Sequence, residues 1–257
     1  MVLLGRSDSY EYANNRTLQC LNRTDKCQSV SDVYNYDKDN LIGYDMSDYP
    51  NKGADRNKSY HVLLSKSDGR ITREIFIPFK TINTPVTKEG VVGYFDQIRP
   101  AHGKWTLMET SSDTLYSYSS DGRLTPFIVR TPSAHTMEPE IFLYMGIYTN
   151  RYYFMRTVKN VFDLEKGNGF YDEQLMYDKE ENALFRISVY NDDYVEKRTV
   201  AVTARSLNHE IEDVTSLSAS RLVEEYKKNN LKGKLKEIAA GLDEDDNPVI
   251  MLKKHKR

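Results

Sequence analysis

The sequence predicts an all-β protein from two observations. The chain holds 19 Tyr, against 13 Gly, 8 Pro and a single Trp, and Tyr suits the half-exposed surface of a pleated strand. The tetrapeptide Ser-Asp-Gly-Arg occurs at 67–70 and again at 120–123, each time between two runs rich in β-forming residues. Asp-Gly between such runs is a strong hairpin signal, because both central residues must accept a positive φ.

Weaker copies of the same hairpin flank these two. One turns near Asp25 and the other near Glu181, so four turns follow one another at intervals of 43, 53 and 60 residues. A repeat of this length, with room for four strands, is the spacing of β-propeller blades. We therefore predict a β-propeller of four-stranded antiparallel blades, with about four blades in this chain.

Two further strands precede each of the later hairpins, and the inner ones carry the longest apolar runs, as strands buried on both faces do. Their predicted ranges are 32–36 and 40–44, then 91–98 and 104–109, then 141–148 and 151–158. We assign the packing between blades to six aromatic residues: Phe76, Phe127, Phe142, Tyr144, Phe154 and Phe185.

The end of the chain departs from the repeat. Between 217 and 242 the apolar residues recur every three to four positions, which predicts two short amphipathic helices with a break near Asn229 and Asn230. Pro248 then ends the helical region, and residues 249–252 are predicted to form a closing strand.

Two stretches carry a resemblance to a known family. One is 114–159, which begins TLYSYSSDGR, and the other is the ending 232–256, which contains DDNPVIML. They resemble the C-terminal part of six-bladed β-propeller proteins of gut Bacteroidales, whose function is undefined, and the similarity covers about residues 30–257. The resemblance implies a six-bladed fold and an exported location, in the periplasm or as a lipoprotein of the outer envelope.

The chain departs from this family at its amino end. Members usually begin with an export signal, whereas the only apolar run at the start here is Val2-Leu3-Leu4, which is too short for a signal-peptide core. We expect residues 1–257 to form a single propeller domain that is shortened at the amino end, with 217–242 as a helical insertion. Open blade edges would then let the chain form oligomers.

Composition and motifs argue against several classes of function. The chain has 36 Lys and Arg against 38 Asp and Glu, so it lacks the basic field of a nucleic-acid binder. It has no apolar run of the ~18 residues that a membrane span needs, and no hydrolase or nucleotide-binding motif. We predict no metal and no cofactor, because the five His are scattered and the acidic run 243–247 is followed by Pro248 where a calcium loop needs Gly. The sequence leaves open whether Cys20 and Cys27 form a disulfide.

The connections between strands differ in length on the two faces of the predicted propeller. Tight turns occupy one face, near Asp37, Asp68, Asp121 and Thr149, whereas the other face carries long connections. Long loops on a rigid scaffold are where binding residues concentrate. We predict four binding residues on these long connections: Tyr49, Arg56, His135 and Tyr171.

Two functions from different classes fit these features. The first is a non-catalytic binding or scaffold propeller of the bacterial envelope, which holds a glycan, a peptide or a protein on its long-loop face. The alternative is an enzyme of the propeller lactonase or lyase type. Such an enzyme needs at least three carboxylate or amide oxygens around a central divalent metal, and no catalytic residue is predicted here.

Overall fold

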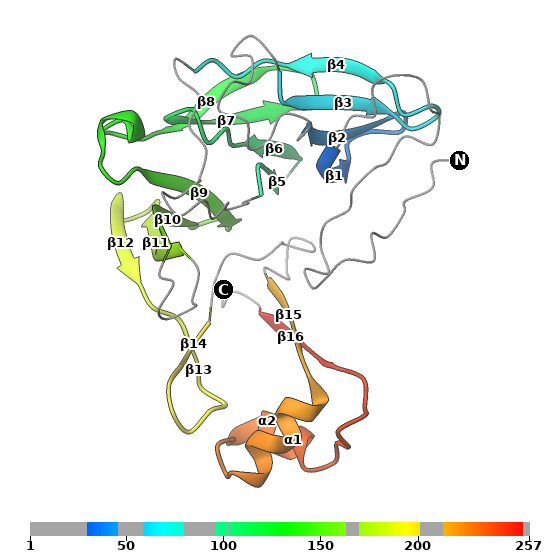
Figure 1. Cartoon of the computed structure of the whole chain (residues 1–257), viewed down its shortest axis with the longest axis vertical. Helices are drawn as coiled ribbons and strands as arrows, with labels where there is room; N and C mark the ends of the chain where they lie inside the picture. The colour runs from blue at the N-terminus through cyan, green and yellow to red at the C-terminus, as the bar shows by residue number, and fades with distance from the viewer. Residues whose placement is uncertain are drawn as a thin grey trace. The chain divides into compact units, whose positions relative to one another are not determined.

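The computed structural model describes residues 30–45, 59–79, 96–101, 103–162, 170–200 and 213–253. These residues form three four-stranded antiparallel sheets, two two-stranded sheets and two short α-helices (Figure 1). The predicted all-β class, its four-stranded antiparallel units and its two helices are confirmed.

Each four-stranded sheet is a meander whose strands lie in sequence order. The first sheet comprises β1 (Val30–Asn35), β2 (Asn40–Asp45), β3 (His61–Ser65) and β4 (Ile71–Ile75). The second comprises β5 (Ile98–Ala101), β6 (Lys104–Leu107), β7 (Thr114–Ser119) and β8 (Leu124–Val129), and the third β9 (Ile141–Tyr148), β10 (Tyr152–Phe162), β11 (Phe170–Asp178) and β12 (Ala183–Ile187).

The predicted turns lie between the third and fourth strands of each sheet. Gly69 and Gly122 adopt φ values of 76° and 80°, and Asn182 takes the corresponding place between β11 and β12 with φ 52°. A left-handed backbone of this kind is open mainly to Gly and, less often, to Asn. The hairpin predicted around Asp25, with Cys20 and Cys27, lies outside the described residues.

Two details of the sequence prediction are wrong. Of the inner strand predicted over 91–98, residues 91–95 lie outside the described residues, and Asp96 and Gln97 are not in a strand. The described strand here, β5, begins at Ile98, extends to Ala101 and includes Pro100. Proline is tolerated there because β5 is an edge strand of its sheet. Phe76 and Phe185 do not pack in a core, since they are 49% and 39% exposed on or beside the outer strands β4 and β12.

The other predicted core aromatics are buried to different degrees. Phe142 and Tyr144 are buried, and Phe127 and Phe154 are half-buried.

The chain divides into two compact units, residues 1–143 with 158–171 and residues 144–157 with 172–257. In the first unit the first and second sheets share one apolar core. Its buried members are Ile42, Tyr44, Leu63, Ile75, Ile77, Ile98, Leu107 and Tyr118. The rings of Tyr34 and Trp105 pack beside it with their centroids 5.5 Å apart.

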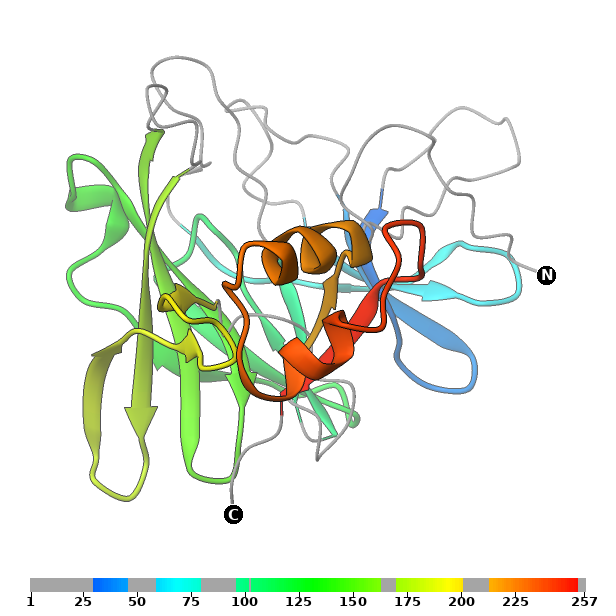
Figure 2. The ribbon, with the colours of Figure 1, turned by 90° about the horizontal axis from the view of Figure 1, so that it is seen from below.

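The second unit contains the short strands β13 (Tyr190–Asn191) and β14 (Arg198–Thr199) and the pair β15 (Asp213–Leu217) and β16 (Val249–Lys253). Helices α1 (Ala219–Lys227) and α2 (Gly233–Ala239) lie between β15 and β16 in the chain (Figure 2). Asn229 takes φ 56° just after α1, which confirms the predicted break. The closing strand is also confirmed as β16, paired antiparallel with β15.

Candidate functional site

Two of the four predicted binding residues lie within the described part of the chain. His135 is exposed in a short 3-10 helix, η1 (Ala134–Thr136), between β8 and β9. Tyr171 is 47% exposed and is the second residue of β11. Because β9, β10 and β11 are antiparallel neighbours, the starts of β9 and β11 lie at the same end of the sheet. Tyr49 and Arg56 lie outside the described residues.

The segment that carries His135 is fixed to the second sheet by polar contacts. Nε2 of His135 lies 3.0 Å from the carbonyl oxygen of Ser111, and the amide of Ala134 donates to Asp113 at 2.9 Å. Asp113 also forms an ion pair with Arg130. Although burial opposes it, hydrogen bonds from Ser133, Ala134 and Arg130 hold the pKa of Asp113 below its usual value. His135 is therefore an exposed side chain on an anchored support.

Buried polar groups connect the first sheet to the second. The Gln97 amide donates to Oδ2 of Asp32 at 2.5 Å, and Nε2 of His61 lies 3.3 Å from the carbonyl oxygen of Gln97. His61 is fully buried. Burial lowers the pKa of its imidazole to about 4, although hydrogen bonds with the backbone of Gln97 and Met108 oppose the change.

Glu109 is a further buried titratable group between the same two sheets. Its carboxylate accepts hydrogen bonds from the Tyr44 hydroxyl at 3.1 Å and from the Ser111 amide at 3.2 Å. Burial raises the pKa of Glu109 to about 7, and these hydrogen bonds oppose the rise. Neither His61 nor Glu109 could be recognised from the sequence, because a single polar residue at a strand end gives no sign that it is buried.

The tight turns at the opposite end of the strands use their carboxylates internally. Asp37 accepts hydrogen bonds from the amides of Asp39 and Asn40 at 2.8 and 2.6 Å, as predicted for a turn of this composition. Asp68 accepts from the Arg70 amide, and Asp121 from the Arg123 amide. These carboxylates stabilise their own turns.

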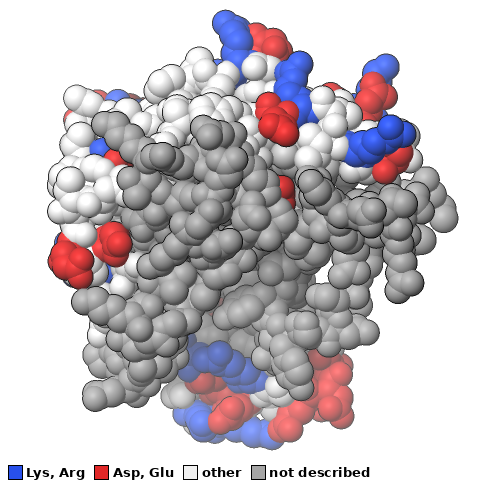
Figure 3. Space-filling view, turned by 45° about the horizontal axis from the view of Figure 1, so that its top comes forward, with Lys and Arg blue, Asp and Glu red and all other residues white. Residues whose placement is uncertain are grey.

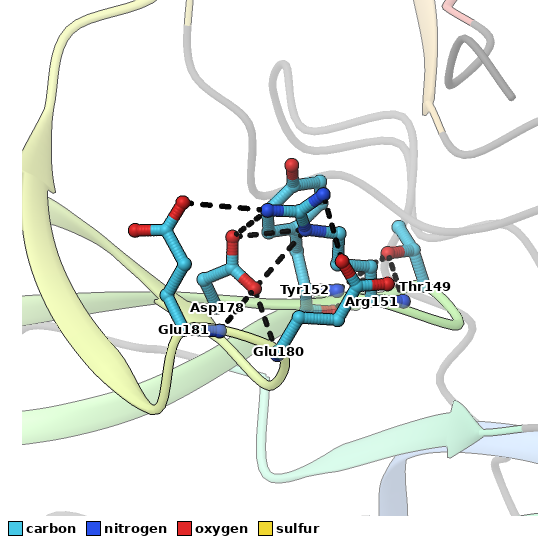
Figure 4. Close-up of polar contacts among 6 residues, drawn as sticks. All are labelled: Thr149, Arg151, Tyr152, Asp178, Glu180 and Glu181. Atoms are coloured by element: carbon cyan, nitrogen blue, oxygen red, sulfur yellow. Dashed lines mark hydrogen bonds and ion pairs between the residues drawn. The ribbon is translucent and has the colours of Figure 1, made fainter.

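Arg151 joins the two tight turns of the third sheet (Figure 4). Its guanidinium donates two hydrogen bonds to Oδ2 of Asp178, at 2.9 and 2.6 Å, and pairs with Glu180 at 2.9 Å. The side chain of Asp178 is 4% exposed. The hydrogen bonds from Arg151 hold the pKa of Asp178 below its usual value. This cluster clamps the β9–β10 turn to the β11–β12 turn.

Charges of both signs are mixed on the visible surface. In the coloured part of Figure 3, Lys and Arg stand beside Asp and Glu, and among the exposed pairs are Arg70 with Asp68 and Arg123 with Asp121. Within the described ranges, no group of three or more His, Cys, Asp or Glu side chains is placed to hold a metal ion. No helix in the same ranges has the length and apolar character needed to cross a membrane.

Comparison with known proteins places these sheets in a family. Among solved structures, the chain is similar to the crystal structure, at 2.60 Å resolution, of a protein from Bacteroides fragilis NCTC 9343 that is provisionally described as exported. The two are 13% identical with a TM-score of 0.49, and the similarity covers 89% of this chain and 74% of that one. No curated protein matches the chain. The profile of the family DUF5128, described as 6-bladed beta-propeller, matches residues 7–216, so this chain belongs to that six-bladed β-propeller family.

Proposed function

We propose that this protein is a non-catalytic binding or scaffold propeller of the bacterial envelope, and that its long-connection end holds a glycan, a peptide or a protein. The observation that carries the proposal is the contrast between the two ends of the strands. The described tight turns engage Asp37, Asp68 and Asp121 in their own hydrogen bonds. The long-connection end presents His135 and the half-exposed ring of Tyr171.

The chemistry of these residues suits an anchor role. Aromatic and Arg side chains dominate the binding energy of most interfaces, because they bury a large area and also form hydrogen bonds. The contact between His135 and Ser111 orders the imidazole before any partner arrives, which reduces the entropy lost on binding. Tyr49 and Arg56 complete the proposed anchor set.

The enzyme alternative receives no support from the described residues. Glu109 has the carboxyl whose pKa is raised to about 7, and such shifts often mark catalytic acids. However, Glu109 is only 7% exposed, and both of its oxygens are bonded, to Tyr44 and to Ser111. Its geometry is that of a structural contact between two sheets.

The test compares variants that change the two ends separately. One carries Tyr49→Ala, Arg56→Ala, His135→Ala and Tyr171→Ala, and the matched control carries Asp37→Asn, Asp68→Asn and Asp121→Asn. Both are applied, with the unchanged protein, to a glycan array and to a Bacteroidales envelope extract, and each captured partner is then purified and titrated.

We expect the first variant to lose at least about tenfold in affinity, because truncating even one anchor costs ~2 kcal/mol or more. Its melting temperature should stay close to that of the unchanged protein, and the control variant should keep the affinity. If the partner binds the first variant normally but fails to bind the control, the binding end has been assigned wrongly. If the unchanged protein binds no glycan and no purified partner, the proposed function is contradicted.

A further inference from the structure

The second unit contains a pocket of about 480 Å³ that the proposed function does not use. Small-molecule sites in proteins have volumes of ~300 to 1,000 Å³. Its walls come from the β13–β14 hairpin, from β15 and β16, and from the first turn of α1. The described residues that line it are Asn191, Tyr194, Arg198, Thr199, Val200, Thr215, Ser216, Leu217, Ser218, Arg221, Leu222, Met251 and Lys253.

The hairpin wall of the pocket is fastened to the segment between the two helices. Tyr194 forms a β-bridge with Leu231, the Val195 amide donates to the carbonyl oxygen of Asn230 at 2.9 Å, and the Lys232 amide donates to that of Asp193 at 2.8 Å. Tyr194 and Leu231 belong to the buried core of this unit. The pocket is therefore built into the fold rather than left between loose loops.

The described lining carries positive charge. It includes Arg198, Arg221 and Lys253, and none of the described lining residues is Asp or Glu. Arg198 is paired with Glu225, and its guanidinium lies over the Tyr194 ring at 4.4 Å from the centroid. Arg198 therefore forms part of the pocket wall. Arg221 is exposed and has no ion pair within the described part of the chain, so its charge is available to a ligand.

The start of α1 adds to this positive field. Ser218 at the N-cap makes no side-chain cap hydrogen bond, and the first turn of the helix has no acidic residue. The first amides of a helix have no partner within the helix and point outward with partial positive charge. Together with Arg221, this helix end favours a carboxylate over a neutral group.

The rest of the lining consists of hydroxyl and apolar side chains. Thr199, Thr215, Ser216 and Ser218 supply hydroxyls that donate and accept hydrogen bonds. Leu217 and Met251 supply apolar surface, against which the C–H face of a sugar ring packs. A carboxylate, several hydroxyls and an apolar ring face occur together in a sugar acid. We propose that this pocket binds an acidic monosaccharide, whose carboxylate is held by Arg221 at the start of α1. Lys253 lies opposite Asp213, at the end of the β15–β16 pair away from α1, and donates to Oγ1 of Thr215 at 3.4 Å, so it adds positive charge to the pocket without holding the carboxylate.

Isothermal titration of the full chain tests the proposal. The probes are glucuronate, galacturonate and N-acetylneuraminate, and the controls are glucose, which has no carboxylate, and acetate, which has no sugar ring. The variants are Arg221→Gln and Lys253→Gln. The matched control is Lys227→Gln, because Lys227 lies on the same helix, pairs with Glu244 and does not line the pocket.

We expect at least one sugar acid to bind ten times or more tighter than both glucose and acetate. Arg221→Gln should weaken that binding about tenfold, as the loss of a charged hydrogen-bond donor does. Lys253→Gln should weaken it less, and Lys227→Gln should leave it unchanged. The proposal is overturned if no sugar acid binds, if glucose or acetate binds equally well, or if Arg221→Gln, melting like the unchanged protein, keeps full affinity. The anchor residues of the proposed function lie on other elements, so either proposal can fail without the other.

Discussion

The Tyr44 hydroxyl donates a hydrogen bond to Oε2 of Glu109 at 3.1 Å. This contact joins the end of β2, in the first sheet, to the segment that follows β6, in the second sheet. Tyr44 is 6% exposed and Glu109 is 7% exposed, so the contact is closed to water. A charged carboxylate in such a place loses its hydration. The contact between the two sheets therefore depends on the protonation state of Glu109.

The first prediction concerns the pH dependence of stability that Glu109 causes. Its pKa is about 7 in the folded chain, against a usual value of 4.5, so the unfolded chain releases this proton at lower pH. The contribution of Glu109 to the free energy of unfolding should fall as pH rises from about 4.5 to 7, by on the order of 3 kcal/mol in total. In Glu109→Gln this fall should disappear, as measured by urea unfolding between pH 4.5 and 8. Identical pH profiles for the two proteins would contradict the assignment.

The second prediction concerns His61, whose effect has the opposite sign. Its pKa is about 4 in the folded chain, against 6.5 usually, so the unfolded chain binds a proton that the folded chain does not. The contribution of His61 should be fully present above pH 6.5 and should be lost as pH falls to about 4. The stability difference between the unchanged protein and His61→Gln should therefore shrink over this range in urea titrations. A difference that stays constant with pH would mean that His61 is protonated equally in both states.

The extent to which the fold could be predicted follows from how local each signal is. The turn at 67–70 was predictable because its chemistry lies within four residues, and Gly69 takes the expected positive φ. Strand β5 was placed too early because Arg99 and Pro100 carry no strand signal, and pairing with Thr106 and Trp105 brings them into the sheet. Strands β13 and β14 have two residues each, too few for a periodic pattern.

The candidate site was less predictable because its contacts join distant positions. His135 could be selected from its place on a long connection, but its contact with Ser111 bridges 24 positions. Tyr44 and Glu109 are 65 positions apart, and neither residue alone indicates a buried carboxyl. The burial of Glu109 results from the packing of two sheets, which no local pattern encodes.

The third prediction compares two glycines in equivalent turns. Gly69 and Gly122 have φ values of 76° and 80°, so replacement of either by Ala brings backbone strain, about 1 to 2 kcal/mol for a left-handed residue. A Cβ at Gly69 meets open space, whereas a Cβ at Gly122 meets the guanidinium of Arg73, which donates to the Tyr118 hydroxyl at 3.3 Å. Gly122→Ala should therefore lower the free energy of unfolding more than Gly69→Ala in matched urea titrations. Equal losses would show that Arg73 moves aside without cost.

The last prediction concerns the clamp formed by Arg151. Its guanidinium makes hydrogen bonds to Asp178, whose side chain is 4% exposed, and so ties two turns together. Arg151→Gln leaves this shielded carboxylate without its cation, which costs more than losing a solvated pair. The matched control is Arg186→Gln, because Arg186 and Glu173 pair at 3.0 Å with side chains 72% and 44% exposed, and such pairs add little stability. Thermal unfolding at pH 7 should show a clear drop in melting temperature for Arg151→Gln and almost none for Arg186→Gln. If the two variants melt alike, the contact between Arg151 and Asp178 contributes no more than a surface ion pair.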